Sequence, residues 1–194
     1  FKGGQSELSI QSQLQGLAFN LPAPLHKKAE EQVAFKFENL VQSVSSSNPS
    51  KALRDQLQLT WGRSLSASYL RDVSGADPRV IQGRWQVGEN FATPGVALAE
   101  TGVTASFNLP SLSLDDWVQV LSPPKSSPAW RPAQSSALSP ATQSYLPTRM
   151  TLKANEVTVQ GRQLRSVLVS GSRDGYVWRS NLDAKEFSGY LEYR

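Results

Sequence analysis

The stretch "RDQLQLTWGRSLSASYL" (residues 54–70) contains two runs of alternating apolar and polar residues, separated by Gly62-Arg63. In the first run, Leu57, Leu59 and Trp61 alternate with polar side chains. Alternation with a period of two predicts a β-strand that has one apolar face. A short connection containing glycine is typical of a β-hairpin. The stretch therefore predicts two adjacent strands that place their apolar side chains on one side of a sheet.

The same alternation continues along most of the chain. Further runs lie at residues 7–14, 33–40, 80–87, 102–109, 148–159, 163–171, 176–184 and 187–194. The connections "QGRQ" (160–163) and "SRDGY" (172–176) have the composition of tight turns, and Asp174-Gly175 is the strongest hairpin signal among them. The sequence thus predicts a mainly β fold with about ten half-apolar strands.

Two short segments carry helix signals. In "SLDDWVQVL" (113–121), Ser113 is suited to the N-cap position, and Asp116 follows three residues later, as in a capping box. In residues 24–31, Pro24 suits the first turn of a helix, and Lys27 and Glu31 have the spacing of a helical charge pair. The second segment follows the alternating run "GLAFNL" (16–21), so we expect a strand that ends in a short helical crossover.

A segment rich in proline and serine divides the chain. Residues 122–141 contain five Pro and six Ser, which predicts a long loop. This loop separates a strand-rich section (1–121) from a C-terminal β-meander (142–194). Because the meander alone is too small to bury a core, we expect it to continue the same sheet.

The overall composition excludes several classes of function. The chain has 194 residues, a net charge of +4 and no cysteine, which excludes disulfides and thiolate metal sites. Its Lys and Arg residues are dispersed, so nucleic acid is not an expected partner. No run approaches the roughly 20 apolar residues of a membrane-spanning helix. Because residue 1 is not Met, we expect the chain to be a piece of a longer protein.

The titratable residues do not form a catalytic pattern. His26 is the only histidine, and it lies in a lysine-rich run. The sequence therefore offers no other histidine that could act as the base of a nucleophile–base pair. The neighbouring carboxylates Glu30-Glu31 and Asp115-Asp116 do not face each other on a helix. We therefore predict no enzymatic activity, no catalytic residues, no metal site and no cofactor.

About ten one-sided strands need a cover for their apolar face. Each large apolar side chain gains roughly 1.5–3 kcal/mol on leaving water, so an uncovered face would cost as much as the stability of a domain. The strands can cover one another in a sandwich or closed barrel. Alternatively, a long curved sheet can hold apolar molecules such as lipid chains. Alternation alone leaves both arrangements open.

Tryptophan adds little to this choice. Trp61, Trp85 and Trp178 fall on apolar strand rows, where core packing is expected, and Trp117 is expected to dock the helix at 113–121 on the sheet. Trp130 lies between prolines in the long loop, either as a partner contact or as a plug over the apolar face.

Three motifs resemble the YhdP-type proteins of the AsmA-like superfamily. "LQGLAFNLPAPLHKKA" (14–29) resembles their Leu-x-Gly-Leu-x-x-x-Leu-Pro-Ala-Pro-Leu signature, and "FNLPSLSLDDWVQVL" (107–121) is similar to their strand followed by a Leu-Asp-x-Asp-x-Trp element. Ser113 stands where an Asp is usual. Residues 152–194 resemble their repeated unit, in which strands carry Gly, then Trp, then a second Gly. The three motifs occur in the family's order and touch most of the chain.

This resemblance implies a fold, a setting and a function. The fold would be a long, strongly curved antiparallel sheet, the AsmA-like β-groove, with one or two short helices. The chain would be a periplasmic section of an inner-membrane-anchored protein whose anchor lies outside it. The groove would carry phospholipids between the inner and outer membranes and so support the outer-membrane permeability barrier. Its partners would be phospholipid acyl chains and neighbouring repeats of the same parent chain. The candidate groove-lining residues are Phe19, Phe35, Phe37, Leu57, Leu59, Trp61, Trp85 and Phe107.

Two other functions fit a β-rich chain without catalytic residues. One is a closed β-domain that acts as a periplasmic scaffold or assembly module. The other is a carbohydrate-binding β-sandwich, for which a row of exposed aromatic side chains is expected.

Overall fold

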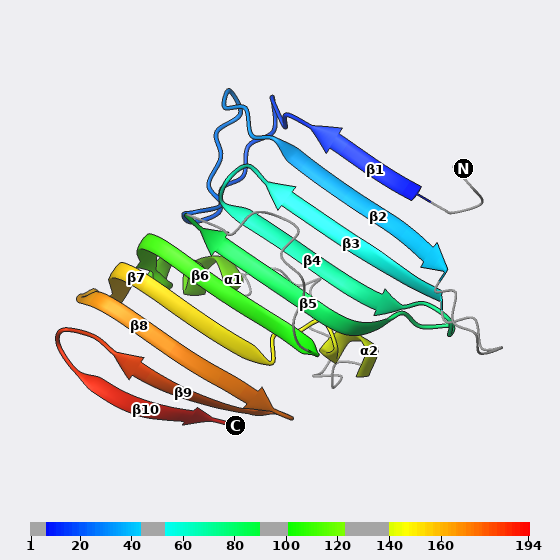
Figure 1. Ribbon diagram of the computed structural model, residues 1–194. Helices are drawn as coiled ribbons and strands as arrows, with labels where there is room; N and C mark the ends of the chain where they lie inside the picture. The colour runs from blue at the N-terminus through cyan, green and yellow to red at the C-terminus, as the bar shows by residue number, and fades with distance from the viewer. Residues whose placement is uncertain (1–6, 44–52, 90–100, 123–139) are drawn as a thin grey trace, which may run out of the picture.

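Ten strands form one open sheet in the computed structural model, which describes residues 7–43, 53–89, 101–122 and 140–194. The spatial order of the strands is their order in the chain, so β1 and β10 are the two edges (Figure 1). The predicted mainly β, curved sheet is confirmed, and the sheet is not closed. The strands are β1 (Glu7–Ser12), β2 (Phe35–Ser43), β3 (Leu53–Trp61), β4 (Leu65–Asp72), β5 (Arg79–Gly88), β6 (Gly102–Ser113), β7 (Arg149–Val159), β8 (Arg162–Asp174), β9 (Val177–Asp183) and β10 (Ser188–Tyr193).

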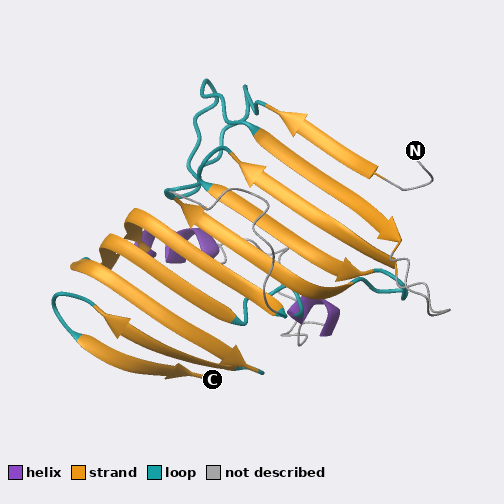
Figure 2. Cartoon of the chain, viewed as in Figure 1, coloured by secondary structure: helices purple, strands orange, loops and turns teal. Residues whose placement is uncertain are grey.

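The pairing is antiparallel except at the centre of the sheet. There β6 pairs parallel with both β5 and β7. Parallel neighbours require a connection that crosses over the sheet. Between β6 and β7 the connection includes α1 (Leu114–Leu121) and α2 (Pro140–Gln143). Figure 2 shows α1 behind the strands, so this described part of the connection lies over one face of the sheet.

The register places most apolar side chains on one face of the sheet, here called the apolar face. Residues paired across a ladder point to the same side. One row of such pairs crosses six strands, through Phe37, Leu59, Ala67, Trp85, Ala105 and Met150. The next row lies on the opposite face and is polar, through Lys36, Thr60, Ser66, Gln86, Ser106 and Thr151. The alternation in the sequence is therefore the difference between the two faces of one sheet.

Across β6, β7 and β8 the alternation changes phase at one line. The ladders are interrupted at Pro110, Asn155 and Ser166, and Ser166 has a positive φ of 51°. Each strand skips one residue at this line, so the register between the strands is unchanged while the alternation of their side chains shifts by one. As a result, residues three apart join the same apolar cluster, in the pairs Leu109 and Leu112, Ala154 and Val157, and Leu164 and Val167.

The buried centre lies under the segment that returns to β7. Val103 on β6 is fully buried, and its carbonyl accepts hydrogen bonds from the backbone N–H (2.7 Å) and the hydroxyl (3.0 Å) of Thr148. The neighbouring Gly83 has no side chain, and the Tyr69 ring lies so close that a Cβ on Gly83 would be 2.7 Å from its Cδ1. The Tyr69 ring thus fills the place of the missing side chain.

Gly88, at the end of β5, is a position where only glycine fits. Its φ is 109°, and a Cβ there would lie 1.8 Å from the carbonyl oxygen of Asn108. Gly88→Ala is therefore expected to lower the free energy of unfolding by about 2–3 kcal/mol, measured by urea denaturation. Gly175→Ala is the control because its Cβ would meet nothing within 4 Å, and it is expected to cost about 1 kcal/mol for its φ of 58°. Equal losses in the two variants would contradict the close contact at Gly88.

The helix expected at 24–31 and the strand expected at 16–21 are not formed. Residues 13–34 instead make a loop in which Phe19 and Lys27 form an isolated antiparallel bridge. The helix expected at 113–121 is present as α1, and the Ser113 hydroxyl accepts the predicted cap bond from the Asp116 N–H (3.2 Å). The hairpin turns at Gly62, Gly161 and Gly175 are formed as well. Most of the predicted loop 122–141, including Trp130, lies outside the described residues.

Candidate functional site

The predicted lining residues lie together on the apolar face. Seven of them lie on strands and share this face by register: Phe35, Phe37, Leu57, Leu59, Trp61, Trp85 and Phe107. Phe19 comes from the loop 13–34, and its ring meets that of Trp61 edge-on at a centroid distance of 4.7 Å. All eight side chains are half-buried. A packed core would bury them fully, so this face retains access from outside.

The apolar face contains a hollow of about 460 Å³ over β4 to β7. Its wall consists only of apolar and aromatic residues: Pro24, Leu25, Leu65, Trp85, Val87, Phe107, Leu109, Leu112, Leu114, Trp117, Met150 and Leu152. Trp85 and Phe107 were predicted as lining residues. The other wall residues were missed. Those from α1 are placed by the β6–β7 connection, and Pro24 and Leu25 are placed by the loop between β1 and β2. Leu65, Val87, Leu109 and Leu112 lie on the strands themselves. Met150 and Leu152 lie on an alternating run, and this was a usable signal.

Helix α1 and the loop 13–34 together form a partial cover over this hollow. The indole Nε1 of Trp117 donates to the carbonyl oxygen of Ala23 (3.3 Å), which joins the two elements. The Asp115 carboxylate accepts hydrogen bonds from the backbone N–H groups of Gln160 (2.7 Å) and Gly161 (2.9 Å), which ties α1 to the β7–β8 turn. No residue of α1 is buried, so the helix rests on the apolar face without sealing it.

A buried lysine holds the loop 13–34 in shape. The Lys27 side chain is fully buried, and its Nζ donates to the carbonyl oxygens of Leu17 (2.7 Å) and Lys28 (3.0 Å). The backbone of Lys27 pairs in both directions with that of Phe19 (2.8 and 3.0 Å). The two bonds from Nζ use two of the three N–H donors of the ammonium and offset part of the cost of burying it. The loop is thereby held so that Phe19 and Pro24 reach the apolar face.

A polar network limits the apolar face at the opposite end of the strands. Asp55 and Arg71 are paired across β3 and β4, with the Arg71 Nε 2.8 Å from Asp55 Oδ1. Arg71 Nη1 also donates to the Tyr145 hydroxyl (2.8 Å), and the Tyr69 hydroxyl donates to the Tyr145 carbonyl (3.0 Å) while accepting from the Trp85 indole. The bond to Asp55 raises the pKa of Arg71, and burial raises the pKa of the Tyr69 phenol. The network therefore attaches the segment around Tyr145 to the sheet.

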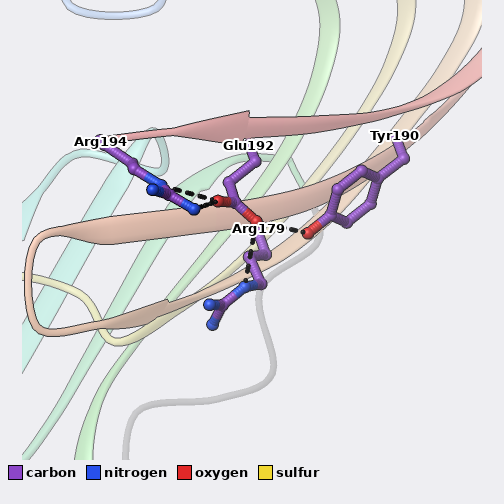
Figure 3. A network of polar contacts seen from close by, with 4 residues as sticks. All are labelled: Arg179, Tyr190, Glu192 and Arg194. Carbon is purple, nitrogen blue, oxygen red and sulfur yellow. Dashed lines mark hydrogen bonds and ion pairs between the residues drawn. The ribbon is translucent and has the colours of Figure 1, made fainter.

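A second polar cluster lies on β9 and β10, at the C-terminal edge of the sheet. Glu192 on β10 accepts hydrogen bonds from Arg194 (2.9 Å), Tyr190 (3.2 Å) and Arg179 (3.3 Å), as Figure 3 shows. The bonds from Arg194 and Tyr190, together with the nearby charge of Arg179, lower the pKa of this carboxyl. The cluster belongs to the polar face, because Arg179 and Glu192 are paired and alternate with Trp178. It does not contribute to the hollow.

Within the described residues there is no group of three or more His, Asp or Glu side chains that could hold a metal ion. In the same part of the chain, the helices are too short or too polar to cross a membrane.

The family model described as YhdP protein matches residues 1–194, the whole chain. No curated protein and no solved structure is significantly similar to it. The motif resemblance and the family match thus agree, and the open sheet with one apolar face is the fold that the resemblance implied. The chain therefore belongs to the YhdP family, which places it among the bacterial envelope proteins of the AsmA-like group.

Proposed function

We propose that this chain is a section of a lipid-carrying groove. Phospholipid acyl chains lie along the apolar face, and the lipid moves between the inner and outer membranes in support of the outer-membrane permeability barrier. The section works in the periplasm, as part of a parent chain that is anchored in the inner membrane. The function involves binding and passage and no catalytic step.

The observation that carries this proposal is the apolar face of an open sheet. Its side chains form rows across successive strands, and the hollow above β4 to β7 has a wholly apolar wall. Such a surface gains about 25 cal/mol per Å² when an acyl chain displaces water from it. Exposed apolar surfaces of this kind mark sites for lipids or for apolar partners.

The two other candidate functions have less support. A closed β-domain and a carbohydrate-binding sandwich both require the strands to seal their own interior. The described strands form one layer with two free edges. An apolar wall without polar groups also gives a sugar no hydrogen-bond partner.

Photocrosslinking tests the proposal with controls one residue away. A photoreactive phenylalanine at Phe35 or Trp61 faces the groove, and the same residue at Lys36 or Thr60 faces the polar side. Irradiation in bacterial cells is expected to attach phospholipid at positions 35 and 61 and not at 36 and 60, as detected by mass spectrometry. The groove would be contradicted if no position crosslinks to lipid, or if positions on both faces crosslink equally.

A further inference from the structure

A second hollow adjoins the apolar one where several strands end. Its volume is about 470 Å³, and its wall is formed by Pro24, Arg63, Ser64, Gly88, Glu89 and Pro110. Pro24 lines both hollows, so an apolar and a polar space share one wall. A molecule with a chain and a polar head could occupy both at once.

The second hollow carries one positive and one negative side chain. Arg63 lies in the β3–β4 turn and Glu89 follows β5. The Gly88 N–H donates to the Ser64 carbonyl (2.9 Å), so the residues that carry the two charges flank a hydrogen-bonded pair. Within the described part of the chain, neither side chain takes part in an ion pair. Both charges are therefore available to a ligand.

We infer that the second hollow receives the headgroup of a zwitterionic phospholipid of the phosphoethanolamine type. The phosphate lies against the Arg63 guanidinium, and the ammonium lies against the Glu89 carboxylate. An acyl chain of the same lipid extends past Pro24 into the apolar hollow. This inference rests on the proposed function and adds a headgroup class to it.

Charge complementarity selects among lipids. A guanidinium binds a phosphate through charge-assisted hydrogen bonds, and every phospholipid supplies that phosphate. Only a zwitterionic headgroup also supplies a cation for Glu89, whereas an anionic headgroup such as phosphatidylglycerol leaves this carboxylate unpaired beside a negative ligand. Arg63 therefore supports binding of all phospholipids, and Glu89 supplies the preference.

Lipid retention separates the two roles. The purified chain is incubated with vesicles of equal phosphatidylethanolamine and phosphatidylglycerol content, and retained lipid is measured by mass spectrometry. The chain without substitutions is expected to retain phosphatidylethanolamine in about fivefold excess over phosphatidylglycerol. One partly exposed charge contact supplies a difference of this size. Glu89→Gln brings the ratio close to one. Arg63→Gln lowers retention of both lipids by about the same factor.

Matched controls come from the polar face. Glu38→Gln and Arg179→Gln remove the same side-chain charges from β2 and β9, on the side of the sheet that does not line either hollow. Both variants are expected to retain the two lipids in the same amount and ratio as the chain without substitutions. Circular dichroism is recorded for all four variants, and because Arg63 and Glu89 are exposed, their folds are expected to be unchanged.

The outcomes distinguish the inference from the proposed function. If the chain without substitutions retains lipid but Arg63→Gln and Glu89→Gln behave like their controls, the headgroup site is wrong. The proposed lipid-carrying groove is not contradicted by that result. If no chain retains lipid, the groove itself is wrong. Glycerophosphoethanolamine has the headgroup without acyl chains, and displacement of lipid by an equal concentration of it would indicate a soluble ligand and overturn the inference. Failure of this compound to compete, together with the two charge effects, supports a lipid site.

Discussion

Val103→Asp is expected to unfold the protein, with a loss of more than about 4 kcal/mol in the free energy of unfolding. Val103 is fully buried on β6, beneath the segment that returns to β7. A carboxylate there would have no charged partner, and an unpaired buried charge costs several kcal/mol even after it takes up a proton. Typical domains have only about 5–15 kcal/mol to lose. Thermal and urea denaturation followed by circular dichroism measure the effect.

Leu59→Asp is the matched control on the same face. Leu59 is half-buried, so its carboxylate keeps access to water and the fold is expected to survive with a loss of about 1–2 kcal/mol. The carboxylate introduced by this substitution is expected to abolish lipid retention. An acyl chain that lies against it would have to displace its bound water, which costs free energy. Unfolding of Leu59→Asp to the same extent as Val103→Asp would indicate a sealed core in place of a groove.

Asp55→Asn is expected to lower the free energy of unfolding by about 2–3 kcal/mol. Asp55 is 3% exposed and binds the guanidinium of Arg71, which in turn binds Tyr145. The isosteric amide removes the negative charge and leaves Arg71 with a weaker partner in a desolvated place. The loss is expected to extend to the attachment of residues 144–148, because these contacts hold that segment to β4. Urea denaturation measures the stability.

An exposed pair provides the comparison for this change. Lys36 and Glu38 form an ion pair of 2.8 Å on the polar face, and Glu38→Gln is expected to cost less than about 0.5 kcal/mol. A double-mutant cycle with Arg71→Gln isolates the Asp55–Arg71 coupling. A coupling energy below about 0.5 kcal/mol, the size expected for an exposed pair, would show that the network does not stabilise this end of the sheet.

Much of the sheet could be predicted because side chains alternate with a period of two. Phe37, Leu59 and Trp85 share a face in the structure as the alternation required, since register follows from which face is apolar. The helix at 113–121 could be predicted as well, because its cap is a local interaction between Ser113 and the Asp116 N–H. These features depend on residues close together in the chain.

The features that were missed depend on contacts between distant residues. Residues 24–31 carry local helix signals, yet Lys27 buries its amine among the carbonyls of the loop, and Phe19 packs on Trp61. These tertiary contacts outweigh the helix preference. The parallel pairing of β6 depends on crossovers that alternation does not encode. The phase change at Pro110 could have been suspected, since proline cannot donate a ladder bond, but its alignment with Asn155 requires the three-dimensional register.

The strand order described above determines how such a protein gains length. Every described strand pairs only with its neighbours in the chain, so another strand can be added at either edge without a new interior to fill. Each addition extends the molecule by about 4.8 Å, and ten strands reach roughly 45 Å. The reach of a protein built in this way is therefore proportional to its number of strands, and its cross-section stays constant.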